Sequence, residues 1–226
     1  MTITQQTFRG ALFDLDDTLI DRAGSFERLF RIIYERDSAI RSTHSLEGMM
    51  NLVWEYDEWG TAPKEVLFER MLTQWPGMSG TVPELVAFYW AELLAGMRRI
   101  PGACEFVAEL NQSGYPWGIV TNGDEKQYRK MESAGLDGVA PFAIPSQLFG
   151  EDKPAPGVFL EGLKRLGMES SEVLFVGDTP YTDIVGAHAV GMRTAWVSRG
   201  RAYPSDMPSP DYVIGHVSEL RPLLVV

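Results

Sequence analysis

Two aspartates, Asp14 and Asp16, lie two positions apart at the end of the first apolar run of the sequence. Side chains alternate between the faces of a strand, so these carboxylates point the same way if the strand continues between them. Carboxylates this close repel, so one stays ionised while the other can carry a proton, or a cation relieves the repulsion. The pair can therefore supply a nucleophile, a general acid and base, or metal ligands.

A second group of polar residues, placed after later apolar runs, suits phosphate binding. Thr121, Asn122 and Gly123 follow the second long run, and Lys153 precedes a segment with helical character. The Thr121 hydroxyl and the backbone N–H groups around Asn122 and Gly123 can hold phosphate oxygens. The Lys153 ammonium would add fixed positive charge for phosphate and nucleophile alike.

The remaining acidic residues of this kind favour a magnesium site. Asp178 follows a later apolar run, and Asp183 lies five residues beyond it. Mg²⁺ prefers oxygen ligands, so Asp14, the main-chain carbonyl of Asp16 and Asp178 would form a partial shell, whereas no cluster of His or Cys indicates zinc. In phosphoryl transfer Asp14 can attack phosphorus, and Asp16 can protonate the leaving oxygen and then activate water.

Each motif taken singly also has a structural explanation. Asp-Asp-Thr after a strand is typical of a turn or a helix N-cap, Thr-Asn-Gly is a common turn, and Gly-Asp-Thr-Pro can end a strand. Their occurrence in order on successive strand ends favours one shared site, because ligands of open α/β sheets bind beyond the carboxyl ends of the strands.

Short apolar runs alternate with helix-like segments, which predicts an α/β fold with a doubly wound parallel sheet. The expected strands are Gly10–Leu15, Trp117–Thr121, Phe142–Ile144, Val173–Val176, Thr194–Val197 and Tyr212–Ile214. The expected helices are Glu105–Ser113, Glu125–Ala134, Pro156–Leu166 and Thr182–Val190, each followed by a glycine suited to a left-handed C-terminal cap: Gly114, Gly135, Gly167 and Gly191.

Residues 22–97 break this alternation and predict an inserted α-helical cap domain. The segment holds only helical patterns, at Phe26–Ile33, Leu46–Trp54, Lys64–Leu72 and Val82–Leu94. The sheet domain would then be discontinuous, comprising residues 1–21 and 98–226, with Pro101-Gly102 as a re-entry hinge. Four tryptophans of the insert could pack in a helical core or stack on a substrate base.

The charge balance limits the possible partners. Twenty basic and 31 acidic residues give a formal net charge of −11. Such a chain repels nucleic acid and anionic membranes, so we expect neither partner, and a phosphate site must supply its own cations. The sequence starts without the pattern of a secretion signal and has no membrane-length apolar run, which predicts a cytoplasmic protein. We expect a monomer, with a homodimer as the alternative.

Four segments together resemble the motifs of the haloacid dehalogenase (HAD) superfamily. They are Phe13–Leu19, Val120–Gly123, Lys153–Pro156 and Gly177–Asp183. They occur in the family's order, and the likeness covers the whole sheet domain, from about residue 8 to the end of the sequence. The resemblance implies a Rossmann-like HAD core, a C1-type cap made by the helical insert, and a hydrolase that uses Mg²⁺.

The resemblance also implies individual roles. The family's roles fall on Asp14 (nucleophile), Asp16 (general acid and base, and magnesium through its carbonyl), Thr121 with Asn122 and Gly123 (phosphate), Lys153 (charge stabilisation), and Asp14, Asp178 and Asp183 (magnesium). Asp183 could instead bond to residues that coordinate the metal, without coordinating it directly.

The phosphatase branch is favoured within this family. True dehalogenases lack the second aspartate of the first motif, whereas this sequence has Asp16. Phosphonate cleavage would need a cap lysine for imine formation, and Lys64 is the only lysine in the insert. We therefore expect hydrolysis of a small soluble phosphomonoester, such as a nucleoside monophosphate, phosphoglycolate or a sugar phosphate. A phosphosugar mutase and a non-enzymatic phospho-acceptor signalling module remain alternatives, and whether the tryptophans or Arg70 touch substrate stays open.

Overall fold

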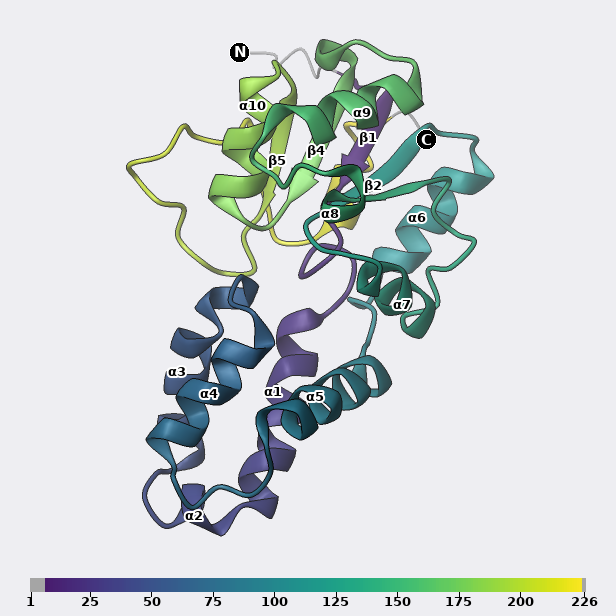
Figure 1. The fold of residues 1–226 in the computed structure, drawn as a ribbon. Coiled ribbons are helices and arrows are strands. Elements are labelled where there is room, and N and C mark those ends of the chain that lie inside the picture. Colours follow the sequence, from purple (N-terminus) through teal and green to yellow (C-terminus); the bar gives the residue numbers. More distant parts are fainter. Residues whose placement is uncertain (1–6, 225–226) are drawn as a thin grey trace. The chain divides into compact units, whose positions relative to one another are not determined.

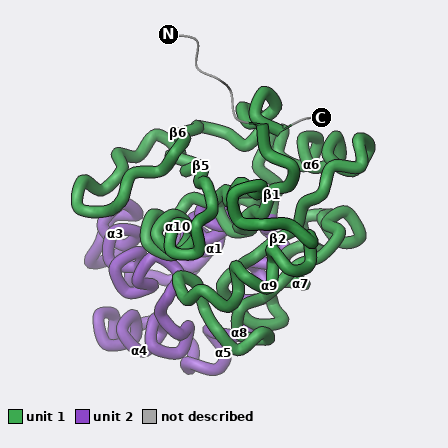
Figure 2. The backbone as a smooth tube through the Cα atoms, turned by 90° about the horizontal axis from the view of Figure 1, so that it is seen from above, with its two compact units in different colours: residues 1–21, 98–226 green, residues 22–97 purple. Residues whose placement is uncertain are grey.

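The computed structural model describes residues 7–224, which belong to two compact units. One unit combines the residues up to Asp21 with those from Arg98 onward, and the other comprises Arg22–Met97 (Figure 2). The first unit carries the sheet and the second is helical, so each is described by itself.

The sheet unit contains six parallel strands in the order β3-β2-β1-β4-β5-β6. The strands are β1 (Gly10–Phe13), β2 (Trp117–Thr121), β3 (Ala143–Pro145), β4 (Val173–Gly177), β5 (Arg193–Val197) and β6 (Tyr212–Ile214). The predicted doubly wound parallel sheet is confirmed, and β1 lies inside it between β2 and β4 (Figure 1). This order brings the carboxyl ends of β2, β1 and β4 side by side.

Both faces of the sheet are covered, which explains the unbroken apolar runs of the strands. On one face Leu12 packs in a buried cluster with Phe159 of α9 (Pro156–Leu166) and Phe175. On the other face the Phe13 ring contacts Phe106 of α6 (Ala103–Gln112), with ring centroids 6.3 Å apart. Successive residues of a strand thus pack against the helices on opposite faces of the sheet.

The other helices of the sheet unit are short. They are α7 (Lys126–Ser133), α8 (Ser146–Phe149), a π-helical segment at Pro180–Val185 and α10 (Gly186–Ala189), with 3₁₀ turns at Ser170–Glu172 and Val217–Leu220. The single helix expected over Thr182–Val190 is therefore a π-helical segment followed by one α-helical turn. All four glycines predicted after helices have positive φ values: 70° at Gly114, 68° at Gly135, 65° at Gly167 and 80° at Gly191.

The helical unit contains α1 (Arg22–Arg36), α2 (Ser38–Arg41), α3 (Leu46–Tyr56), α4 (Lys64–Gln74) and α5 (Val82–Gly96), with a 3₁₀ turn at Glu58–Gly60. Its core is aromatic: Phe30 of α1 stacks on Phe68 of α4, and both rings contact Tyr89 of α5. A fully buried carboxylate, Asp57, pairs with Arg22 at 2.6 Å and with Lys64 at 2.5 Å.

The chain leaves and re-enters the sheet unit through two paired segments. The Asp21 amide donates to the Arg98 carbonyl at 2.9 Å, and the Ile100 amide donates to the Leu19 carbonyl at 3.1 Å. Between these bonds Ile20 and Arg99 form an antiparallel bridge. The two crossings therefore adjoin one another, just before the left-handed turn at Gly102 that begins α6. Within residues 7–224 no helix is long and apolar enough to cross a membrane.

Candidate active site

The polypeptide turns sharply after β1, and this turn separates the two aspartates of the first motif. The strand ends at Phe13, the Asp14 amide still bonds to the Val176 carbonyl at 2.8 Å, and Asp17 has a φ of 59°. The condition for the two carboxylates to share one strand face is therefore not met. Asp14 and Asp16 instead contact different partners.

The Asp14 carboxylate is buried beside the ammonium group of Lys153. Lys153 Nζ lies 2.7 Å from Asp14 Oδ1 and 2.7 Å from Asp183 Oδ1. It also donates to the Val120 carbonyl at 3.0 Å. Three acceptors thus surround the three ammonium protons, which fixes the position of this buried cation.

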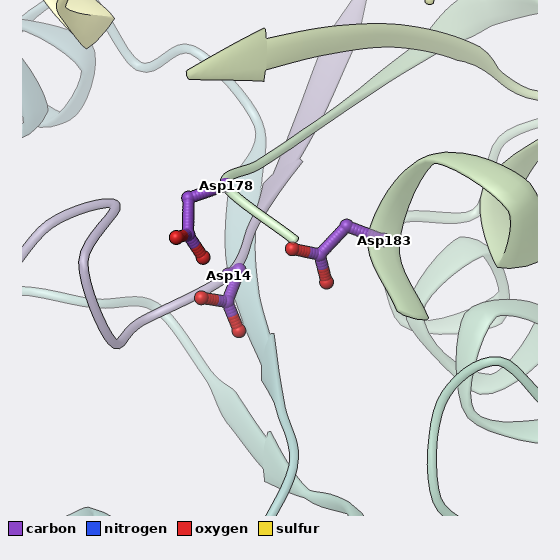
Figure 3. Close-up of side chains that lie close together, drawn as sticks. All are labelled: Asp14, Asp178 and Asp183. Atoms are coloured by element: carbon purple, nitrogen blue, oxygen red, sulfur yellow. The ribbon is translucent and has the colours of Figure 1, made fainter. Parts of the chain in front are cut away.

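Three buried carboxylates converge at the same place. Asp14 follows β1, Asp178 follows β4, and Asp183 comes from the π-helical segment, yet each has a carboxylate oxygen within 4.8 Å of one from each of the others. Figure 3 shows the three side chains directed toward a common region. An all-oxygen donor set of this kind suits a hard divalent cation such as Mg²⁺.

The local electrostatics favour a bound cation. Burial raises the pKa of Asp14 well above its usual range; Lys153 opposes this shift, and Asp183 and Asp178 add to it. Burial, Asp183 and Asp17 raise the pKa of Asp178 to about 6 against the opposing effect of Arg201. The three carboxylates outnumber the two cations that contact them, Lys153 and Arg201, so the residues present fit a bound divalent cation.

The charged state of Lys153 is strongly favoured. Burial would lower the pKa of this ammonium, but the adjacent carboxylates of Asp14 and Asp183 outweigh that effect and raise it. Lys153 therefore remains a cation at physiological pH. Its backbone is held in place by the side chain of Asn122.

The loop after β2 positions Lys153 through Asn122. The Asn122 side chain donates to the Lys153 carbonyl at 3.0 Å and accepts from the Lys153 amide at 2.8 Å. The Gly123 amide donates to Ser146 Oγ at 3.1 Å, and Gly123 has a φ of 133°, a conformation that favours glycine. Asn122 and Gly123 thus fasten two loops together, a role that the sequence had not indicated.

Asp183 requires a glycine at the end of β4. A Cβ atom on Gly177 would lie 2.6 Å from the Asp183 Cβ, closer than such atoms approach. The Thr179 amide donates to Asp183 Oδ2 at 2.9 Å, which leaves Oδ1 of the same carboxylate on Lys153. The Gly-Asp-Thr sequence therefore allows the carboxylate of the next helical segment to pack against the strand end.

The carboxylate of Asp16 is held by helix α7. Asp16 Oδ2 lies 2.6 Å from Lys130 Nζ and accepts from Gln127 Nε2 at 3.1 Å. The same Gln127 amide donates to Thr121 Oγ1 at 2.5 Å. Sequence reasoning placed α7 but assigned no role to Gln127 or Lys130; their signal was two polar residues three positions apart, hence on one helix face, just after Thr121-Asn122-Gly123.

Arg201 is a third residue that sequence reasoning missed. Its guanidinium donates to the Asp178 carbonyl at 2.8 Å and to Asp178 Oδ2 at 2.9 Å. It lies in the long connection between β5 and β6, where no periodic pattern marks a functional position.

The tryptophans, Arg70 and Lys64 of the helical unit differ in their exposure and in their contacts. Trp75 is buried, whereas Trp59 is 77% exposed and stacks on Trp54 with ring centroids 5.3 Å apart. Arg70 pairs with Glu58 at 2.9 Å and also donates to the Tyr56 carbonyl. The ammonium of Lys64, the residue considered for imine formation, is bonded to the Asp57 carboxylate.

Comparison with known proteins shows which class of protein has this fold and this arrangement of residues. A model of the family "Haloacid dehalogenase-like hydrolase" matches residues 11–197. The chain belongs to this family, as the resemblance of its four motifs implied, and it is an enzyme of the hydrolase class.

Curated relatives align over most of their length. The chain is 30% identical to the glyceraldehyde 3-phosphate phosphatase of Pyrococcus abyssi, over 95% of this chain and 91% of that protein. It is 32% identical to the ribulose-1,5-bisphosphate 5-phosphatase of Halopiger xanaduensis, over 81% and 82% of the two chains. These relatives are named as phosphatases of small phosphorylated metabolites.

Solved structures show the same fold. The HAD phosphatase of Thermococcus onnurineus superimposes with a TM-score of 0.65 at 25% identity, over 94% of this chain and 96% of that one. The HAD-hydrolase YfnB of Bacillus subtilis, in a form bound to magnesium, superimposes with a TM-score of 0.74 at 24% identity, over 95% and 97% of the two chains.

Proposed function

We propose that this hydrolase is a magnesium-dependent phosphatase that cleaves a small soluble phosphomonoester through an aspartyl-phosphate. The observation that carries the proposal is the buried contact of the Asp14 carboxylate with Lys153, beside Asp178 and Asp183. A carboxylate, a fixed ammonium and a set of oxygen ligands suit attack on phosphorus. The phosphatase names of the relatives support the same reaction.

In the first step Asp14 Oδ forms a bond to phosphorus while the ester P–O bond breaks. The electron pair of that bond passes to the ester oxygen, which takes a proton from Asp16 and leaves as an alcohol. In the second step Asp16 removes a proton from water, the water oxygen attacks phosphorus, and the Asp14–phosphorus bond breaks to release inorganic phosphate. Lys153 and the hydroxyl of Thr121 stabilise the phosphoryl oxygens in both steps.

Asp14, Asp178, Asp183 and the carbonyl of Asp16 would hold Mg²⁺. A divalent cation here supplies neutralisation of the phosphate charge. The cation would also offset the repulsion between this acidic protein, with its net charge of −11, and an anionic ester. Asn122 and Gly123 support the phosphate site by holding Lys153 and the loop after β2.

The substrate is a small phosphorylated metabolite of the kind that the relatives act on. Glyceraldehyde 3-phosphate, a sugar bisphosphate, phosphoserine and phosphoglycolate appear among the substrates in their names. A panel of these esters with a nucleoside monophosphate, assayed for released phosphate with Mg²⁺ or with a chelator, identifies the preferred class.

The decisive variant is Asp14→Asn, because an amide cannot attack phosphorus as a carboxylate does. We expect the turnover of the best ester to fall by at least about a thousandfold with the fold retained in circular dichroism. Asp206→Asn is the matched control, since Asp206 is an exposed acid of the same unit. Wild-type turnover by Asp14→Asn would overturn the nucleophile assignment.

A further inference from the structure

Helix α7 presents two buried polar side chains to the site. Gln127 and Lys130 lie three residues apart, hence on one face of the helix, and are 2% and 6% exposed. Buried polar groups need hydrogen-bond partners, and both of these side chains find them on residues of the proposed mechanism. Lys130 Nζ contacts Asp16 Oδ2 at 2.6 Å, and Gln127 contacts Asp16 and Thr121.

The chemistry of these contacts fixes the direction of each hydrogen bond. A lysine ammonium only donates, so Asp16 Oδ2 is an acceptor for Lys130. The contact of Gln127 with the same oxygen must then come from its amide N–H₂, which settles the orientation of the amide. The second hydrogen of that amide points to Thr121 Oγ1 at 2.5 Å. Thr121 Oγ1 therefore accepts from Gln127, and its own O–H must donate in another direction.

We propose that Gln127 and Lys130 are positioning residues of the phosphatase reaction: they hold the Asp16 carboxyl by one oxygen and turn the Thr121 hydroxyl into a donor for phosphate. This inference rests on the proposed function. Both contacts on Asp16 fall on Oδ2, so they fix the plane of the carboxyl group that protonates the leaving oxygen. Gln127 links this acid to the phosphate ligand, so helix α7 aligns proton donor and phosphate as one unit.

Leaving-group dependence tests the role of Lys130. An alkoxide needs a proton as it leaves, whereas p-nitrophenolate leaves without one, so misplacing the Asp16 carboxyl slows the first step only for the alkyl ester, while the second step is common to both esters. For Lys130→Met we expect the single-turnover rate of alcohol release from an alkyl phosphate to fall ~10–100-fold, a fraction of the ~10²–10⁴-fold contribution of general acid catalysis, and the single-turnover rate of p-nitrophenol release from p-nitrophenyl phosphate to change less than about threefold. Asp16→Asn sets the upper limit of this selectivity.

Two further variants keep the proposal falsifiable if Lys130→Met folds poorly. Lys130→Arg retains a cationic donor and should keep the wild-type ratio of the two single-turnover release rates. Arg129→Met is the matched control, because Arg129 is an exposed cation on the same helix. An equal loss of both single-turnover release rates, or no loss of either, would mean that Lys130 only supports the fold.

Phosphate affinity tests the role of Gln127. Gln127→Glu cannot donate to Thr121, so the Thr121 hydroxyl would donate to the new carboxylate and be lost to the ligand. We expect the inhibition constant of inorganic phosphate to rise about tenfold in Gln127→Glu, with a smaller rise in Gln127→Met. An unchanged constant in both variants would refute this role.

The outcomes separate the two proposals. If the wild-type protein releases no phosphate from any ester, the proposed function fails. If it does so, and Asp14→Asn abolishes the release while the α7 variants leave leaving-group selectivity and phosphate affinity unchanged, only the positioning role fails.

Discussion

The ammonium of Lys153 lies between two buried carboxylates and therefore serves stability as well as chemistry. It contacts Asp14 and Asp183 at 2.7 Å each, in a site from which water is largely excluded. Removing one partner of a buried ion pair is costly because the other charge stays buried without compensation.

For Lys153→Met we expect the free energy of unfolding of the metal-free protein to fall by about 3–5 kcal/mol. Urea denaturation at pH 7.5 measures this, and Mg²⁺ should restore part of the loss because it takes over the neutralisation. Lys164→Met, which alters a lysine side chain that is 81% exposed, should cost under about 0.5 kcal/mol. Equal losses in the two variants would contradict the electrostatic explanation.

At this scale the sequence predicted the residues that lie on strand ends, and the structure does bring Asp14, Lys153, Asp178 and Asp183 together. Gln127, Lys130 and Arg201 were missed for a physical reason: their roles come from contacts with residues distant in the sequence, and only the three-residue spacing of Gln127 and Lys130 marks any of them in the chain. The conditional prediction that Asp14 and Asp16 share a strand face did not apply, because the strand ends at Phe13.

At the scale of elements, the predicted strands lie within two residues of the observed ones, because continuous burial makes each run apolar. The short helices α2 and α8 escaped prediction since four residues hold too little of a helical period. Two contacts connect neighbouring elements. Gly177 at the end of β4 packs against Asp183 of the π-helical segment, and the Asp211 carboxylate bonds to both β5 and α10.

Gly177→Ala should displace the Asp183 side chain and with it the contact to Lys153. We expect activity to fall and the Mg²⁺ concentration needed for half-maximal activity to rise by about tenfold or more, as for loss of a group that orients metal ligands. Gly96→Ala is the control, since a Cβ there meets its nearest neighbour only at 4.0 Å. Unchanged magnesium dependence in Gly177→Ala would show that the strand end tolerates the methyl group.

Asp211 links β5 and α10 in a pH-dependent manner. Its burial would raise the carboxyl pKa, but the Thr194 amide, His188 and Arg193 together lower it. A lowered folded-state pKa adds stability that is present above the unfolded pKa and is lost as pH falls through the folded value. Asp211→Asn should therefore reduce the free energy of unfolding at pH 7 more than at pH 3. An equal reduction at both pH values would exclude the ionised carboxylate as the cause.

At the scale of the whole molecule, binding of Mg²⁺ to the native state should raise the unfolding temperature of the sheet unit. A ligand at about 100 times its Kd stabilises by about 2.7 kcal/mol. Differential scanning calorimetry with increasing Mg²⁺ measures the shift, which Asp178→Asn should abolish and Asp206→Asn should preserve. A shift that survives Asp178→Asn would place the ion elsewhere. The cytoplasmic location and the monomeric state stay predictions from the sequence.

The chain leaves the sheet unit after Ile20 and returns before Arg99, and these two residues pair with each other. The helical unit is therefore an insertion at a single point of the sheet unit. Chain-closure entropy grows only with the logarithm of the length enclosed, so doubling such an insertion costs about 0.6 kcal/mol. The stability of the sheet therefore depends only weakly on the length of the segment inserted at that point. Lengthened, shortened or foreign segments could be grafted there while β1 and β2 keep their pairing.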